Sequence, residues 1–192
     1  MISVKVKNTE LCLDFSFFAA IAIFAFFDKT GLGLASLAMC MLHESAHLIV
    51  MLMLAVTPDR IKFYGAGIAI SACSLDYRSN RVRAAVYSAG CLLNFILALI
   101  FLLCGNGLFS AINLCIGVLN MLPVGELDGA RILRLISERF FEPYRTERLL
   151  RICSAVSVVL CVVIFFVVRG RVSISALISG VYLMILSALN NE

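Results

Sequence analysis

Residues 32–56 read LGLASLAMCMLHESAHLIVMLMLAV, an apolar run that contains both histidines of the chain, His43 and His47. A helix needs about 20 predominantly apolar residues to cross the hydrocarbon core of a bilayer, and this run is long enough. Its charged and imidazole side chains are confined to the pentapeptide HESAH at 43–47. We therefore predict a membrane-spanning helix that carries an ionisable group of residues in the middle of its length.

The composition of the whole chain supports the same interpretation. Of its 192 residues, 62% are hydrophobic and 15% are charged, and the mean hydropathy is +1.03. A soluble domain is about half apolar and about a quarter charged. These values exclude a disordered chain and argue against a soluble globular enzyme. The net charge of +4 does not indicate nucleic acid, because the basic residues flank apolar segments, as membrane topology requires. The lipid bilayer is the expected partner.

Apolar segments that can enter a membrane occupy most of the sequence. There are six of them: 11–27, 32–56, 82–104, 108–122, 149–168 and 172–189. The connections between them are short, so we expect residues 1–192 to form a single transmembrane domain with no separate soluble domain.

Two other stretches differ from simple spans. Residues 61–74 are apolar but too short to cross, and Gly65 and Gly67 favour an extended or re-entrant segment. Residues 126–151 are strongly charged and are expected to form an amphipathic connector at the membrane surface. The predicted fold is an all-α integral membrane protein of about six transmembrane helices, with a short re-entrant or β-like membrane segment.

Lysine and arginine are distributed unequally between the two sides of this arrangement. With the N-terminus inside, the outer loops hold only Lys29, Arg169 and Arg171, and the inner segments hold the other 13 of the 16 basic residues. The positive-inside rule then predicts a multi-pass protein of the cell membrane with both termini in the cytosol.

The HESAH pentapeptide has the spacing of a zinc site. Residues four apart on a helix project from the same face, so His43 and His47 can bind one ion. The glutamate between them, Glu44, can then reach a metal-bound water. The alternative is a polar trio buried by helix packing. Ionisable groups at membrane depth are costly and usually functional, which favours the metal site.

A catalytic zinc site needs a third protein ligand, and no third histidine exists. The carboxylate candidates are Asp14, Glu126 and Asp128. The last two follow Pro123 in a glycine-containing stretch, where the backbone can leave a helix and turn back. Spacing alone does not separate Glu126 from Asp128, and an ordinary turn is the alternative interpretation of Asp128-Gly129.

Three motifs together resemble the site-2 protease family of intramembrane zinc metalloproteases. H-E-x-x-H at 43–47 is followed by N-x-x-P-x-x-x-L-D-G at 120–129, and GCLLN at 90–94 is similar to the family's G-P-x-x-N motif. The resemblance extends from about residue 35 to 135. It departs from the family pattern at Cys91, which replaces a proline, and at Ala130, where many relatives carry a second glycine.

The resemblance implies one zinc ion per chain and a role for each matching residue. The implied zinc ligands are His43, His47 and Asp128, the catalytic acid/base is Glu44, the substrate-binding residue is Asn120, and the supporting residues are Asn94, Pro123 and Gly129. The compact arrangement of six spans with both termini inside is most similar to the branch of the family that processes a sporulation pro-sigma factor. We expect neither the CBS domain of that branch nor the PDZ insertion of the envelope-stress branch.

The function that follows is regulated intramembrane proteolysis of membrane-spanning or membrane-associated protein substrates. A helical substrate hides its carbonyl groups and must unwind to be cut. The unwound strand can pair with residues 63–74, for which a hydrophobic membrane plug is the alternative. Two other functions stay open: a membrane zinc hydrolase of a lipid or prenylated peptide, and a non-catalytic zinc-holding scaffold or transporter. The eight cysteines lack C-x-x-C spacing and are interpreted as small buried apolar residues.

Overall fold

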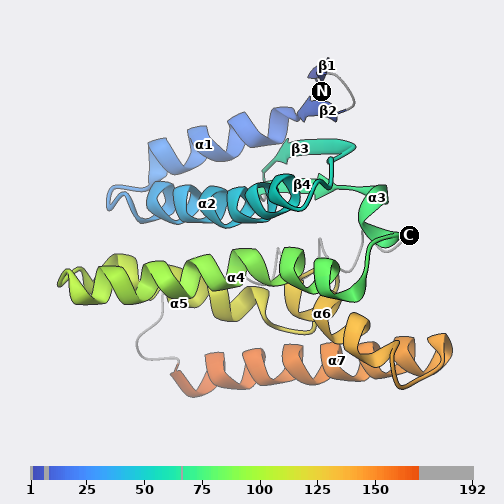
Figure 1. Cartoon of the computed structure of the whole chain (residues 1–192). Helices are drawn as coiled ribbons and strands as arrows, with labels where there is room; N and C mark the ends of the chain where they lie inside the picture. Colours follow the sequence, from blue (N-terminus) through green and yellow to red (C-terminus); the bar gives the residue numbers. More distant parts are fainter. Residues whose placement is uncertain (1, 7–8, 66, 169–192) are drawn as a thin grey trace. The chain divides into compact units, whose positions relative to one another are not determined.

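A computed structural model describes residues 2–6, 9–65 and 67–168 of the chain. These residues divide into two compact units, Met1–Leu119 and Asn120–Glu192. Figure 1 labels the elements in chain order. The first unit holds β1 (Ile2–Val6), β2 (Thr9–Leu13), α1 (Phe15–Phe27), α2 (Leu32–Met53), β3 (Arg60–Tyr64), β4 (Gly67–Ser71), α3 (Cys73–Asp76), α4 (Asn80–Leu103) and α5 (Gly107–Asn120), which ends at the boundary. The second unit holds α6 (Asp128–Ser137) and α7 (Pro143–Val168).

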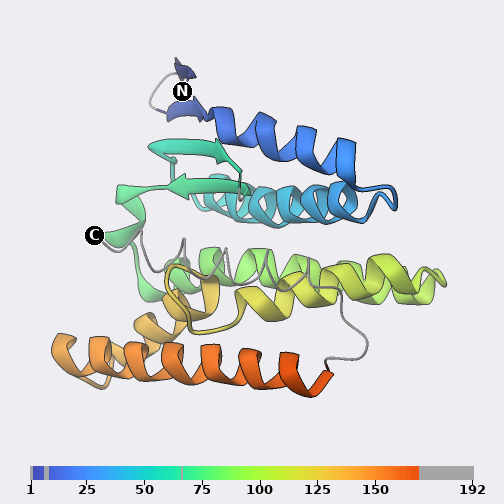
Figure 2. The same cartoon turned by 180° about the vertical axis from the view of Figure 1, so that it is seen from behind.

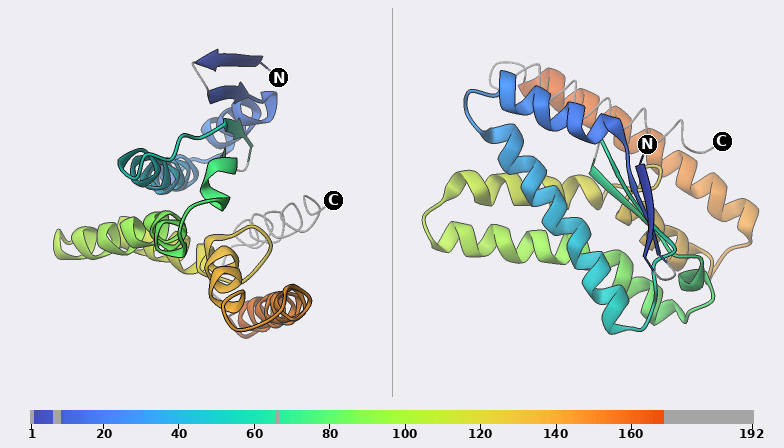
Figure 3. Two further views of the ribbon diagram at one scale, coloured as in Figure 1. Left: turned by 45° about the vertical axis from the view of Figure 1, so that its right-hand side comes forward. Right: turned by 90° about the horizontal axis from the view of Figure 1, so that it is seen from above.

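Two helices of the first unit, α2 and α4, are long and apolar enough to cross a membrane. The turn before α2 is held by Asp28, whose carboxylate accepts hydrogen bonds from the backbone N–H groups of Thr30 and Gly33. Helix α2 crosses α4 along an extensive contact, which the view from above shows (Figure 3). Helices α1 and α5 are apolar but shorter. The described residues are mostly helical, as predicted, and include two helices that could cross a membrane; the predicted number of six spans stays a prediction.

A four-stranded sheet, in the order β1-β2-β3-β4, lies where α1 begins and α2 ends (Figure 2). Strands β3 and β4 form an antiparallel hairpin in which Phe63 pairs with Ile68. The hairpin packs against both helices: α1 against β3, with the rings of Phe17 and Phe63 5.6 Å apart, and α2 against β4. The extended conformation predicted within residues 61–74 is therefore correct.

The prediction of a single apolar segment over residues 11–27 is wrong at its start. Leu11 and Leu13 belong to β2, which pairs in parallel with β3 and antiparallel with β1. The helix begins only at Phe15, after Asp14 accepts a hydrogen bond from the backbone N–H of Ser16 at 3.2 Å. The fold is thus mostly helical with a sheet, and not all-α. The sixth predicted segment, 172–189, lies outside the described residues.

The second unit contains the charged connector predicted over residues 126–151. It is largely helical, comprising α6 and the first turns of α7. On α6 the side chains of Ala130 and Leu135 are buried, and Arg134 is exposed and pairs with Glu147 of α7 at 3.0 Å. The amphipathic character expected of this connector is therefore confirmed for α6.

Candidate active site

The two histidines lie on one face of α2 and are buried, with 3% of His43 and 8% of His47 exposed. Their Nε2 atoms are 3.2 Å apart. The i, i+4 spacing on a helix explains why both rings reach the same place. The structure thus brings together the two histidines that the sequence paired.

Helix α4 sets the tautomer of both neutral rings. The Nδ1 atom of His43 is 3.2 Å from Oδ1 of Asn94, and the Nδ1 atom of His47 is 2.7 Å from the carbonyl oxygen of Val86. Both partners are acceptors, so each Nδ1 carries the proton and donates. In the neutral rings both Nε2 atoms are then unprotonated.

Two nitrogens that face each other at 3.2 Å repel unless a shared proton or a metal cation lies between them. Zinc binds imidazole nitrogen at about 2.0–2.1 Å, which places two nitrogens of a tetrahedral site about 3.3 Å apart. Metal-bound histidines usually donate their other N–H to a carbonyl or carboxylate, as both rings do here. The pair therefore fits a zinc ion in separation, tautomer and outer hydrogen bonding.

Gly90 makes this close approach of the two helices possible. A Cβ atom placed on Gly90 would come closer than 3.0 Å to the Nε2 atoms of both His43 and His47. Only a residue without a side chain leaves room for the two rings and for what they bind. The contacts of Gly90 and Asn94, which lie one helical turn apart, thus explain why the 90–94 motif has a glycine and an asparagine at these two positions.

Glu44 directly follows His43 on α2 and is half-buried. Consecutive helical residues are rotated by about 100°, so Glu44 flanks the face that carries the two histidines. The position of Glu44 therefore differs from that of the two histidines, which share one face of α2.

The two candidate carboxylates of the second unit have opposite environments. Asp128 is the first residue of α6 and is 7% exposed. The side chain of Glu126 is 52% exposed and pairs with Arg131 at 3.4 Å. Burying the carboxylate of Asp128 costs free energy that its surroundings must offset, whereas Glu126 is solvated and is paired with Arg131. This contrast favours Asp128 as the functional carboxylate.

The loop before α6 folds back on its own unit. After Pro123 the backbone turns, with Gly125 at a φ of 53°, and Gly129 packs against the carbonyl groups of Met121 and Leu122. A Cβ atom on Gly129 would overlap this backbone, so Gly129 is needed to position Asp128. Asn120, the last residue of α5, is half-buried at the start of the same loop.

Asp14 is not placed with the histidines. It lies at the start of α1 beside the sheet, 3.7 Å from Lys62, and hydrogen bonds from Ser16 lower its pKa. The sequence did not indicate the role of the Val86 carbonyl, because a backbone acceptor has no residue signature. Gly90 was noticed only as part of the motif.

Comparisons with known proteins found one family match and one similar solved structure. Residues 106–164 match the model of peptidase family M50. The structure is similar to the site-2 protease from Methanocaldococcus jannaschii, with a TM-score of 0.68, 17% identity and coverage of 100% of this chain and 95% of that one. A search of curated proteins found no match. The chain therefore shares the fold of that site-2 protease. The M50 match covers less than half of the chain, and the likeness to the site-2 protease is a likeness of fold.

Proposed function

We propose that this chain is an intramembrane zinc metalloprotease that hydrolyses peptide bonds of membrane-spanning or membrane-associated proteins. The observation that carries the proposal is the pair of Nε2 atoms 3.2 Å apart, on His43 and His47, in the middle of an apolar helix long enough to cross a membrane. Such a pair is costly at membrane depth without a function.

Asp128 is the proposed third ligand of one zinc ion. Its place in the family motif and its burial, in contrast to the exposed Glu126, support this role. Three protein ligands are typical of a catalytic zinc site, which keeps its fourth position open. Pro123 and Gly129 support the loop that carries Asp128.

In the proposed reaction one side chain transfers a proton and another binds the substrate. When bound, zinc would polarise the scissile carbonyl and lower the pKa of water to about 7. Glu44 accepts the proton of the attacking water and delivers it to the leaving amine nitrogen. The amide of Asn120 donates a hydrogen bond to the substrate carbonyl oxygen, where negative charge develops. Val86 and Asn94 hold the two imidazoles in the required tautomer.

The sheet offers a place for an unwound substrate. Strand β4 pairs with β3 along one edge, and within the described residues no strand pairs with its other edge. An extended peptide can add to such an edge through backbone hydrogen bonds. We therefore favour strand addition over a passive membrane plug for this hairpin, which packs against the helix that carries the histidines.

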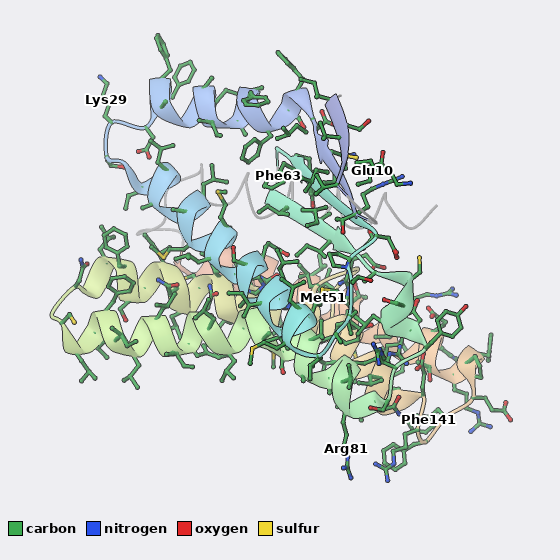
Figure 4. All side chains as sticks on the ribbon, turned by 45° about the horizontal axis from the view of Figure 1, so that its top comes forward. Glu10, Lys29, Met51, Phe63, Arg81 and Phe141 are labelled. Carbon is green, nitrogen blue, oxygen red and sulfur yellow. The ribbon has the colours of Figure 1, made fainter. Side chains whose placement is uncertain are left out.

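The proposed topology has six spans and both termini in the cytosol. In the first unit Lys29 lies in the turn between α1 and α2, whereas Glu10, Phe63 and Arg81 mark the opposite end of the helices (Figure 4). The basic residues Arg60 and Lys62 are in β3, at the end where Arg81 lies. This separation supports a cytosolic sheet under the positive-inside rule.

Two other functions would use the same metal. A zinc hydrolase of a lipid or prenylated peptide needs the same ligands and differs only in substrate. A structural zinc in a scaffold or transporter is normally closed by four protein ligands. The presence of Glu44 beside the two histidines favours a hydrolase.

The proposal is tested with the purified full chain in proteoliposomes. We expect cleavage of single-span protein substrates, loss of cleavage with a zinc chelator and recovery on addition of zinc. Prenylated peptides and phospholipids are offered in parallel. Turnover of these alone would make the chain a different hydrolase, and turnover of protein that survives complete metal removal would contradict the proposal.

A further inference from the structure

Cys91 lies at the metal site, although the family resemblance gives it no role. It follows Gly90 on α4 and is 2% exposed. Its Sγ atom and a ring nitrogen of His43 lie within 4.8 Å of each other. We propose that the thiol of Cys91 can act as a ligand of the same ion that His43 and His47 bind. This inference rests on the proposed zinc site.

The distance is compatible with a shared ion. Zinc binds sulfur at about 2.3 Å and imidazole nitrogen at about 2.0–2.1 Å, so the two donors of a tetrahedral site are about 3.6 Å apart. The observed separation is at most 4.8 Å, and a change in the side-chain torsion of Cys91 can shorten it. The backbone of α4 is already in contact with both rings at Gly90.

A second observation indicates that an electronegative ligand belongs at this place. Asn94 is completely buried, and its Nδ2 atom has no hydrogen-bond acceptor among the residues that the structure describes. Its Oδ1 atom is the partner of His43, so the amide lies at the site. Cys91 and Asn94, three residues apart, lie on the same side of α4. A buried N–H without an acceptor is destabilising, and a thiolate bound to the ion would be an acceptor for it.

A thiolate changes what the site prefers to bind. Sulfur donors favour soft ions such as Cd²⁺ over harder ones. In the fourth position, Cys91 would also close the site, as four protein ligands do in structural zinc sites. The resting protein would then hold its metal firmly, and substrate or water would have to displace the thiol. Coordination releases the thiol proton to solvent.

Cobalt substitution in the full chain, purified in detergent, tests this proposal. Thiolate bound to Co²⁺ gives a charge-transfer absorption in the near ultraviolet, whereas the visible bands of Co²⁺ report binding by any ligand. We expect both signals in the wild type and in Cys40→Ser, a control on the helix that carries the histidines. Cys91→Ser should keep the visible bands and lose the charge-transfer band. Loss of a residue that only hydrogen-bonds to a metal ligand lowers metal affinity by roughly tenfold or more. Loss of a ligand itself should have at least this effect, so we expect the affinity of Cys91→Ser for Cd²⁺ to fall by at least about tenfold.

The outcomes separate this inference from the proposed function. Visible cobalt bands without a charge-transfer band in the wild type would overturn the role of Cys91 and leave the metal site intact. A charge-transfer band that persists in Cys91→Ser would also overturn it. If the wild type binds neither Co²⁺ nor Zn²⁺, the metal site itself is wrong. Should Cys91→Ser fail to fold, Cys91→Ala is measured in the same way.

Discussion

The Nδ1 atom of His43, in the middle of α2, lies 3.2 Å from the Oδ1 atom of Asn94 on α4. Because this oxygen can only accept, it fixes the tautomer that presents Nε2 to a metal. The carbonyl of Val86 does the same for His47. Helix α4 therefore positions the two imidazoles that α2 carries.

Replacing Asn94 should weaken zinc binding through His43. Asn94→Leu removes the acceptor, so His43 can place its proton on either nitrogen, and we expect a loss of zinc affinity on the order of 10- to 100-fold. Asn94→Asp keeps an acceptor and should retain most of the affinity. Competition with a zinc-binding dye measures both variants. Equal affinity in Asn94→Leu and the wild type would show that the contact does not position the ligand.

Gly90→Ala should abolish metal binding although alanine is the better helix former. Its Cβ would come closer than 3.0 Å to both Nε2 atoms and force the rings apart. Gly107→Ala is the matched control, because a Cβ there meets nothing within 4 Å. Zinc content by mass spectrometry and thermal unfolding are measured for both. A Gly90→Ala protein with a full complement of zinc would contradict the geometry of the site.

The two carboxylates of the second unit should respond differently to neutralisation. Asp128→Asn removes a proposed ligand and should lose zinc and cleavage together. Glu126→Gln removes only an exposed ion pair with Arg131, which contributes about 0–1 kcal/mol to stability, and should keep most of both. The result that would overturn the assignment is the reverse: an empty site in Glu126→Gln and a full one in Asp128→Asn.

Reporter fusions test the membrane topology. With 13 of the 16 basic residues assigned to the inner side, we expect reporters at both termini to be in the cytosol. A reporter inserted beside Lys29 should be outside. A C-terminal reporter found outside would mean an odd number of spans, and one of the six predicted segments would not cross.

The elements that bear on the site could largely be predicted from the sequence. The apolar run at 32–56 predicted helix α2. The H-E-x-x-H spacing alone predicted that His43 and His47 lie on the same face of that helix. The glycines of residues 61–74 indicated an extended or re-entrant segment, and the structure has the β3–β4 hairpin there. These features are local, because each depends on residues close together in the chain.

What the sequence did not reveal depends on contacts between distant segments. Strand β2 exists because residues 10–13 pair with β3, some fifty residues away. Strand β1 has a local signal, since apolar and polar residues alternate in ISVKV at 2–6, but this alternation was not interpreted as a strand. The acceptor for His47 is a backbone carbonyl, which any residue at position 86 provides. The interpretation of the cysteines as buried apolar residues is correct for Cys91 and wrong for three others, which are exposed: Cys73, Cys104 and Cys115. The distance of Cys91 from His43 requires a structure.

The central claim is that the two histidines hold a catalytic metal and that Glu44 performs the proton transfer. The most direct test measures zinc content and cleavage of a membrane substrate on the same preparations of wild type and Glu44→Gln. The amide keeps the size of the side chain but cannot accept a proton from water. We predict one zinc per chain in both proteins and cleavage only by the wild type. Full zinc with undiminished cleavage in Glu44→Gln would contradict this account.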